Sequence, residues 1–298
     1  MQGDLKIGVA QLEALAGESE RNLAKILQLA EQAAGEQVSF LCYPEMALHG
    51  YAPKYASELA EPLSSSRVRR LTEAASDLNI TMLVGMAELS GGSDKPYLAQ
   101  VLAFPDGTVE SYHKAHLGRS EKEYFTAGDK FPVFSSHGVK FAVGICWDWH
   151  FPEMAAIYSL KGAELLFAPH ASPVIAGDRR EIWLRYLGAR AYDNSVYLAA
   201  CNLTGTNGQG REFSGGALIL GPKGEILTEL SGGNASGADC RVVREDACGA
   251  PLLTATLSAD RLNTLRRRGR SSMRDSFFLA DRRKELYREL IELEVSEA

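Results

Sequence analysis

The sequence predicts an α/β protein, because three observations point to sheets covered by helices. Short apolar runs rich in β-branched residues alternate with segments whose apolar residues have helical spacing. Two pairs of such runs flank turn sequences, Pro-Asp-Gly at 105–107 and Gly-Pro-Lys-Gly at 221–224, and so predict hairpins. The second half of the chain repeats the element order of the first. Similar halves suggest two pseudo-symmetric sheets, although the pattern alone also fits one mixed sheet.

The first half opens with a strand over 5–12, where apolar residues largely alternate with polar or small ones. A helix follows, with apolar residues at helical spacing from Leu23 to Ala30, and Gly35 ends it. The same reasoning predicts the remaining elements of this half: strands at 38–43 and 80–87, a helix across 68–78, and hairpin strands at 97–104 and 108–112.

The second half opens with an apolar strand over 139–145, followed by a helix that Pro152 begins and Gly162 ends. Segment 205–210, rich in glycine, predicts a mobile loop, and 231–250 an exposed inserted loop that could instead cover an active site or a subunit edge. A charged C-terminal tail starts near residue 266. The other predicted elements are strands at 165–168, 196–201 and 252–257, a helix over 178–194, and hairpin strands at 216–220 and 225–230.

Composition excludes several classes of protein. The 298 residues are 45% hydrophobic and 23% charged, which fits a globular chain with a large core, in one large domain or two. A formal charge of −6 argues against nucleic acid or an anionic membrane as the main partner. No apolar run approaches the roughly 20 residues of a membrane span. Five cysteines without an export signal indicate reduced thiols and a cytoplasmic protein.

Cys146 lies where the strand over 139–145 turns sharply toward the helix that Pro152 begins. Backbone N–H groups just after such a strand are free of ladder partners and can point at an oxyanion. Gly144, which has no side chain, lets the backbone approach its neighbours closely. The alternative is a small buried residue at a strand end, which describes most free cysteines.

Three other stretches carry groups suited to catalysis. The strand ending in Tyr-Pro-Glu delivers Glu45, the hairpin ending in Tyr-His-Lys delivers Lys114, and Glu-Lys-Glu-Tyr-Phe-Thr-Ala-Gly-Asp spans 121–129. With Cys-Trp-Asp and Phe-Pro-Glu, these motifs resemble the nitrilase superfamily, the carbon–nitrogen hydrolases with a Glu-Lys-Cys site. The resemblance runs from about Leu5 to Leu230 and returns near the C-terminus. It implies one domain over 1–298, a four-layer αββα sandwich of two mixed sheets.

The resemblance assigns roles that fit the chemistry of amide hydrolysis, which needs a nucleophile, a base and an oxyanion site. Cys146 is the nucleophile and Glu45 the acid/base. Lys114 stabilises the oxyanion together with the backbone N–H of Trp147. Glu121 orients Lys114 and the substrate. Glu123 is its rival, and only the alignment on Phe-x-x-Gly-Asp favours Glu121.

His150, His170 and Tyr51 are candidates for the substrate pocket. His150 lies just beyond the nucleophile and His170 ends a strand, although both histidines could equally be ordinary polar loop residues. His113 and His116 are three residues apart, but on a loop that follows a strand they share no face and lack a third ligand. We therefore expect no metal and no cofactor, with a metal-dependent hydrolase as a weaker alternative.

The sequence thus predicts a hydrolase that cleaves the C–N bond of a small linear amide, an omega-amide or an aliphatic amide. It would act through a cysteine thioester and release ammonia. Cys-Trp-Asp resembles the amidase and carbamoyl-amide branches more than nitrilases, where Cys-Trp-Glu is usual. The alternatives are an N-carbamoyl-amine hydrolase, then a nitrilase, and outside catalysis a silent scaffold of the same fold. No arginine closely follows Cys146 to pair with a substrate carboxylate, which disfavours carbamoyl amino acids.

The charged C-terminal tail also gives an expectation about the oligomeric state. Residues 281–290 resemble the family's C-terminal segment, which packs across a dimer interface. We therefore expect a homodimer or a higher homo-oligomer.

Overall fold

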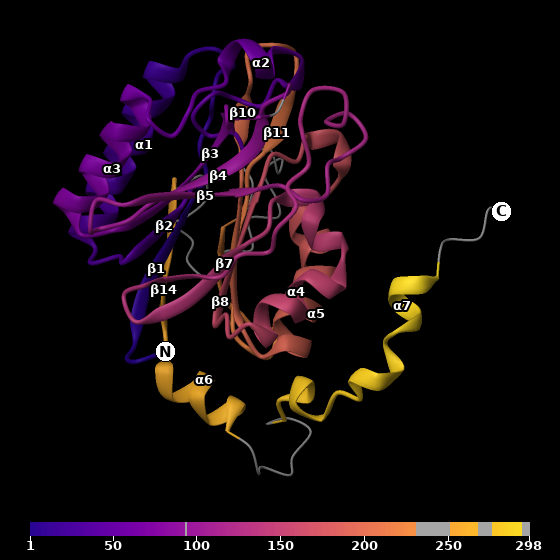
Figure 1. Ribbon diagram of the computed structural model, residues 1–298. Helices are drawn as coiled ribbons and strands as arrows, with labels where there is room; N and C mark the ends of the chain where they lie inside the picture. Colours follow the sequence, from indigo (N-terminus) through magenta and orange to yellow (C-terminus); the bar gives the residue numbers. More distant parts are fainter. Residues whose placement is uncertain (93, 231–250, 268–275, 294–298) are drawn as a thin grey trace.

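A computed structural model describes residues 1–92, 94–230, 251–267 and 276–293. Two six-stranded sheets pack face to face, and helices cover their outer faces (Figure 1). Strand order is β14-β1-β2-β3-β4-β5 in one sheet and β13-β12-β9-β8-β7-β6 in the other. The two-sheet sandwich is therefore confirmed and the single mixed sheet excluded. The predicted inserted loop at 231–250 lies outside the described residues.

The first sheet is built around three parallel strands. β1, β2 and β3 run parallel, the β4–β5 hairpin adds antiparallel strands beside β3, and β14 pairs antiparallel with β1. Helices α1 and α3 lie side by side on its outer face (Figure 1). The bounds are β1 (Leu5–Ala10), α1 (Ser19–Gly35), β2 (Phe40–Cys42), α3 (Ser66–Leu78), β3 (Thr81–Glu88), β4 (Tyr97–Ala103), β5 (Val109–His113) and β14 (Leu252–Leu257).

The second sheet repeats this plan. β7, β8 and β9 are parallel, the antiparallel pair β12–β13 continues from β9, and β6 pairs antiparallel with β7. The similarity of the two halves of the sequence thus reflects two sheets of the same design. The bounds are β6 (Phe134–Ser136), β7 (Val139–Val143), α4 (Pro152–Leu160), β8 (Leu165–His170), α5 (Arg179–Asn194), β9 (Tyr197–Asn202), β12 (Ala217–Leu220) and β13 (Ile226–Leu230).

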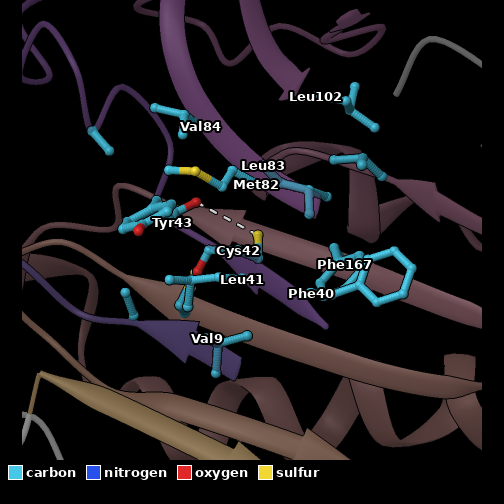
Figure 2. Packing of buried hydrophobic residues seen from close by; sticks show 14 of the residues in the cluster. Val9, Phe40, Leu41, Cys42, Tyr43, Met82, Leu83, Val84, Leu102 and Phe167 are labelled. Atoms are coloured by element: carbon cyan, nitrogen blue, oxygen red, sulfur yellow. Dashed lines mark hydrogen bonds between the residues drawn. The ribbon is translucent and has the colours of Figure 1, made fainter. Parts of the chain in front are cut away.

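The core between the sheets comes from strand residues that alternate in direction. On β8, Leu165 and Phe167 face the other sheet, whereas Leu166 and Ala168 pack toward the helices. Phe167 meets Phe40 of β2 across the sandwich with ring centroids 6.0 Å apart (Figure 2). Each fully buried aromatic ring contributes on the order of 2–3 kcal/mol through the hydrophobic effect. This apolar layer fixes the register of one sheet on the other.

Strand direction places the candidate residues at one end of the sandwich. β5 is antiparallel to β4, which is antiparallel to β3, so β5 runs in the same direction as β2 and β3. Glu45 follows β2 and Lys114 follows β5, so both leave the same edge of the first sheet. Cys146 follows β7 at the carboxyl edge of the second sheet.

Several short elements were not predicted. Residues 204–214 form a small hairpin, so the predicted loop at 205–210 was wrong at its start, where Gly205 and Thr206 belong to a paired strand, whereas 207–210 connect the two strands. Among the described residues, no helix is long and apolar enough to cross a membrane.

The remaining elements are 3₁₀ turns at Pro53–Tyr55, Cys146–His150, Val174–Ala176, Phe278–Asp281 and Lys284–Leu286, helices α2 (Ala56–Leu59), α6 (Ala259–Arg266) and α7 (Glu289–Glu292), and strands β10 (Thr204–Thr206) and β11 (Glu212–Ser214).

Candidate active site

Cys146 occupies the sharp turn that the sequence predicts. It begins a 3₁₀ turn three residues after the end of β7, with a φ of 48°, a left-handed conformation uncommon for residues other than glycine. Gly144 packs so closely that a Cβ there would lie against Met154 and 2.8 Å from a ring carbon of Trp149. The indole of Trp149 donates to the Gly144 carbonyl at 2.6 Å. Cys146 as a residue is partly exposed at this turn, which follows the buried strand β7.

Asp148 holds this turn in place. Its carboxylate is fully buried and accepts hydrogen bonds from the backbone N–H of Ile145 at 2.9 Å and of His116 at 2.8 Å. The hydroxyl of Tyr112 donates to it at 2.8 Å. Asp148 therefore ties the turn that bears Cys146 to the segment that bears Lys114. Asp148, the acidic residue of the Cys-Trp-Asp motif, therefore has a structural role, which the sequence did not reveal.

Glu45 reaches the site because the backbone around it bends sharply. Met46 has a φ of 57°, and a Cβ on Gly85 of β3 would lie 2.5 Å from the carbonyl oxygen of Pro44. The Glu45 side chain is only 1% exposed. Its Oε1 accepts from Nζ of Lys114 at 2.7 Å, and its Oε2 accepts from the backbone N–H of Ala171 at 2.8 Å. Both oxygens are thus held by donors from different segments.

Lys114 also bonds a second carboxylate. Its Nζ donates to Oε1 of Glu121 at 2.8 Å, and the hydroxyl of Tyr51 donates to the same oxygen at 2.7 Å. The backbone N–H of Gly118 donates to Oε2 of Glu121 at 2.6 Å. Glu123, the rival candidate, is exposed. The structure therefore brings Glu121, and not Glu123, to Lys114, with Tyr51 behind it.

Burial and charge set the protonation of these groups. Burial raises the pKa of Glu45 to about 7, against the opposing effect of Lys114. Burial and the negative charge of Glu45 raise the pKa of the Cys146 thiol to about 12. Although burial disfavours its charge, the two carboxylates raise the pKa of Lys114 well above its ordinary value. At neutral pH Lys114 is charged, the thiol holds its proton, and Glu45 exists in both forms.

His170, a candidate for the substrate pocket, is neutral. Burial lowers its pKa to about 3. Its Nδ1 lies 2.7 Å from the carbonyl oxygen of Ala168, which can only accept, so Nδ1 carries the proton and Nε2 accepts from the hydroxyl of Tyr186 at 3.2 Å. The ring of His150 lies 4.7 Å from that of Tyr186. Both predicted histidines thus lie beside this tyrosine, and their part in substrate binding stays a prediction.

The sequence did not predict three groups near the site: the backbone N–H of Ala171, the side chain of Ser172 and the phenol of Tyr186. Oγ of Ser172 lies 3.8 Å from Sγ of Cys146. Ala171 and Ser172 follow β8, which is parallel to β7, so strand order was the signal that could have found them. Tyr186 comes from α5, and no pattern in the sequence marks it.

The histidines considered for a metal site have other partners. Nε2 of His113 lies 3.0 Å from the carboxylate of Glu88, and Nδ1 of His116 lies 3.0 Å from that of Asp148. In the part of the chain that the structure describes, no cluster of three or more His, Cys, Asp or Glu residues could hold a metal ion.

Comparison with known protein families shows to which of them the chain is related. A profile of the carbon-nitrogen hydrolase family matches residues 6–266. The chain belongs to this family. It is 29% identical to an (R)-stereoselective amidase of Pseudomonas sp. over 76% of this chain and 80% of that one. It is 30% identical to a nitrilase of Pyrococcus abyssi over 76% and 85%, and 32% identical to a 2-oxoglutaramate amidase of Bacillus subtilis over 78% and 87%.

Solved structures agree with this family. A variant of the nitrilase-superfamily amidase of Nesterenkonia AN1 superposes with a TM-score of 0.78 and 26% identity, over 97% of this carbon–nitrogen hydrolase and 98% of that chain. A second variant of that amidase carries the acetamide moiety of fluoroacetamide covalently on its active-site cysteine. It superposes with a TM-score of 0.77 and 27% identity, over 97% and 98% of the two chains.

Proposed function

We propose that this carbon–nitrogen hydrolase converts a small linear amide, aliphatic or omega, and water into a carboxylate and ammonium, through a thioester on Cys146. The observation that carries the proposal is the buried Glu45–Lys114–Glu121 cluster beside a thiol on a strained turn. Relatives with amidase names, and the amide-derived group on the cysteine of the Nesterenkonia enzyme, support it.

In the first step Glu45 acts as the base. The high pKa of the thiol leaves little thiolate at neutral pH, so Cys146 needs a base as it attacks. Glu45, with a pKa of about 7, is matched to this task. As Sγ bonds to the amide carbon, the thiol proton moves to Glu45. The carbonyl π electrons move to oxygen and give a tetrahedral oxyanion.

Two donors suit that oxyanion. Nζ of Lys114 has three hydrogens, and the two glutamates use two of them, which leaves one for the substrate. The backbone N–H of Trp147 has no hydrogen-bond partner among the described residues. One such donor typically lowers the barrier by about 3 kcal/mol. We assign the oxyanion to these two groups.

The remaining steps reuse Glu45. The tetrahedral species collapses, the C–N bond breaks, and the nitrogen leaves as ammonia with the proton that Glu45 returns. Deprotonated Glu45 then takes a proton from water, whose oxygen attacks the thioester. Collapse of this second intermediate breaks the C–S bond, returns the proton to sulfur and releases the acid. Glu121 keeps the ammonium of Lys114 in place throughout.

Mass spectrometry tests this function directly. We expect intact protein mixed briefly with butyramide to gain the mass of a butyryl group, located on Cys146 after digestion, and to release ammonia on turnover. The Cys146→Ala variant should gain nothing, and the buried Cys42 and Cys201 should stay unmodified. Faster turnover of butyronitrile than of butyramide would favour the nitrilase alternative. Turnover only of an N-carbamoyl amine would favour the carbamoyl alternative, and no reaction at all the silent scaffold.

We further propose that the protein acts in the cytoplasm as a homodimer or larger homo-oligomer. Sγ of Cys201 lies 3.6 Å from the carbonyl oxygen of Cys42, and we infer that these two buried cysteines stay reduced, as in a reducing compartment. A groove of about 1210 Å³ separates α4 and α5 from the tail over 279–291. The tail exposes apolar side chains that a second copy could cover: Leu286, Tyr287, Leu290, Ile291 and Leu293. Light scattering after gel filtration tests the oligomeric state.

A further inference from the structure

The segment just after β8 contacts both the base and the nucleophile. The backbone N–H of Ala171 donates to Oε2 of Glu45 at 2.8 Å. In the next residue, Oγ of Ser172 lies 3.8 Å from Sγ of Cys146. Hydrogen bonds to sulfur are longer than those to oxygen because the sulfur atom is larger, so this distance allows one between the two side chains.

Asn202 fixes the backbone of Ser172. It ends β9, which pairs with β8, and it is fully buried. The backbone N–H of Ser172 donates to Oδ1 of Asn202 at 2.8 Å, and Nδ2 of Asn202 donates to the carbonyl oxygen of Ser172 at 3.1 Å. The same Nδ2 donates to the carbonyl oxygen of Gly215 at 3.1 Å. The amide cannot turn without the loss of buried hydrogen bonds, so it holds Ser172 in place.

The hydroxyl of Ser172 is directed at the nucleophile. Within the described ranges, Sγ of Cys146 is its only hydrogen-bond partner, and Ser172 is only 5% exposed. A hydroxyl both accepts and donates. It accepts from the thiol while sulfur holds its proton, and after rotation about its C–O bond it donates to a sulfur that carries negative charge.

Negative charge on this sulfur needs a donor. Burial and the charge of Glu45 raise the pKa of the Cys146 thiol, against the opposing effects of Lys114 and of the Ser172 hydroxyl. The ammonium of Lys114 uses two of its hydrogens on glutamates, and the third is assigned to the substrate oxyanion. A direct hydrogen bond to the sulfur is therefore left to Ser172.

We propose that Ser172 is a further catalytic residue, whose hydroxyl donates a hydrogen bond to Sγ of Cys146 as this sulfur leaves the acyl group. The inference rests on the proposed amidase function and adds a residue to its last step. As the C–S bond breaks, its electron pair moves to sulfur, and the O–H group of Ser172 stabilises this charge while it keeps its own proton. The proton that sulfur regains still comes from Glu45.

The hydrogen bond acts unequally on the two halves of the reaction. In deacylation sulfur is the leaving group, and a donor that lowers the pKa of the thiol speeds its departure. In acylation the same donor eases loss of the thiol proton but makes sulfur less nucleophilic, and these effects partly cancel. Loss of the hydroxyl should therefore slow decay of the thioester more than its formation.

Rapid mixing with butyramide, followed by quenching and mass spectrometry, measures both halves. It gives the rate at which the butyryl group appears on Cys146 and, after removal of butyramide, the rate at which it is lost. Ser172→Ala should lower the rate of loss about tenfold, as expected for one hydrogen bond to a charged atom, and the rate of appearance about threefold at most. Ser172→Thr keeps the hydroxyl and should restore most of the rate of loss.

Ser135→Ala is the matched control. It removes the same group from an exposed position of β6, opposite Lys140 near the start of β7 and therefore away from Cys146, and should change neither rate. A wild-type rate of loss in Ser172→Ala would overturn the inference. So would an equal fall in both rates, because Ser172 would then only support the segment that holds Glu45. In both cases the amidase function stands.

Alkylation by iodoacetamide tests the contact between hydroxyl and sulfur without turnover of an amide. Without the donor, about tenfold less thiolate at pH 8 is partly offset by a more nucleophilic sulfur, so Cys146 should be labelled about threefold more slowly in Ser172→Ala. Unchanged labelling would overturn the inference by itself. Wild-type protein that forms no thioester with any amide would instead refute the proposed function, and with it this role of Ser172.

Discussion

The ammonium of Lys114 lies 2.7 Å from Oε1 of Glu45, although each side chain is only 1% exposed. A buried ion pair of this kind adds little net stability, because each charge has lost its hydration. Its two members nevertheless depend on each other, since removal of one leaves the other charge buried without compensation. In this site the pair also fixes the position of the base and of the oxyanion donor.

Replacement of Lys114 by Met should abolish most of the activity. The variant loses an oxyanion donor, which costs about 10²- to 10³-fold in kcat. It also leaves Glu45 and Glu121 buried without a cation, so the free energy of unfolding should fall by about 3 kcal/mol while the fold persists. Steady-state kinetics and urea denaturation measure the two effects. Lys122→Met, at an exposed position, should change neither. A wild-type rate in Lys114→Met would refute the assignment of Lys114.

The dependence of kcat/KM on pH should report Glu45. The carboxylate form accepts the thiol proton, so activity should rise as the pH increases through about 7 and then level off. The apparent pKa belongs to the coupled cluster rather than to one residue. Because the pKa of Cys146 is about 12, we expect no second rise between pH 8 and 9. Glu45→Gln should lack the rise near pH 7. A rise near pH 9 that survives this substitution would indicate a preformed thiolate instead.

Glu121 and Glu123 offer a matched pair of substitutions two residues apart. Glu121→Gln removes a charge that holds Lys114, and displacement of the ammonium should lower kcat about 10- to 100-fold. Glu123→Gln removes the same charge from the exposed side of the segment and should have no effect. Rates of both variants with butyramide decide between the two. Equal rates would contradict the positioning role of Glu121.

These residues also show how far the sequence predicted the site. Glu45, Lys114 and Cys146 each lie within three residues of the end of a strand, and a turn signal or a family motif marks each position. The ends of strands pointed to these positions, and the family motifs were needed to give them catalytic roles and to choose Glu121. The choice of two sheets over one required either the resemblance or the structure, because alternation of strands and helices is the same in both.

The rest of the site depends on contacts between distant segments. Ser172 and the N–H of Ala171 reach the cluster only because β8 lies next to β7, and strand order is not written in local patterns. Tyr186 comes from α5, whose register on the second sheet is set by buried residues such as Trp183 and Leu187. An aromatic side chain on a helix is most often a core residue, so nothing local identified it.

Asp148→Asn should damage both the turn and the activity. The carboxylate accepts from the backbone N–H groups of Ile145 and His116 and from the hydroxyl of Tyr112, and an amide of the same shape would turn an NH₂ group toward some of them. One or two unsatisfied buried donors cost about 1–3 kcal/mol each. We therefore expect lower stability in urea and slower labelling of Cys146 by iodoacetamide. Asp129→Asn, at an exposed position, is the control. Normal labelling and stability in Asp148→Asn would show that the turn holds without this carboxylate.

Gly85→Ala should lower the activity strongly, although β3, the strand that carries Gly85, contributes no catalytic side chain. A Cβ at this position would lie 2.5 Å from the carbonyl oxygen of Pro44 and 2.8 Å from the carbonyl carbon of Glu45, and backbone cannot rotate away as a side chain does. We expect a loss of about 2–3 kcal/mol in the free energy of unfolding. A shift of Glu45 by about 1 Å should lower kcat about 100-fold. Gly35→Ala, at an open position near the end of α1, should be neutral or stabilising, because a Cβ there meets nothing within 4 Å. Full activity of Gly85→Ala at wild-type stability would mean that the segment carrying Glu45 can move aside, against the rigid placement of the base that the mechanism requires.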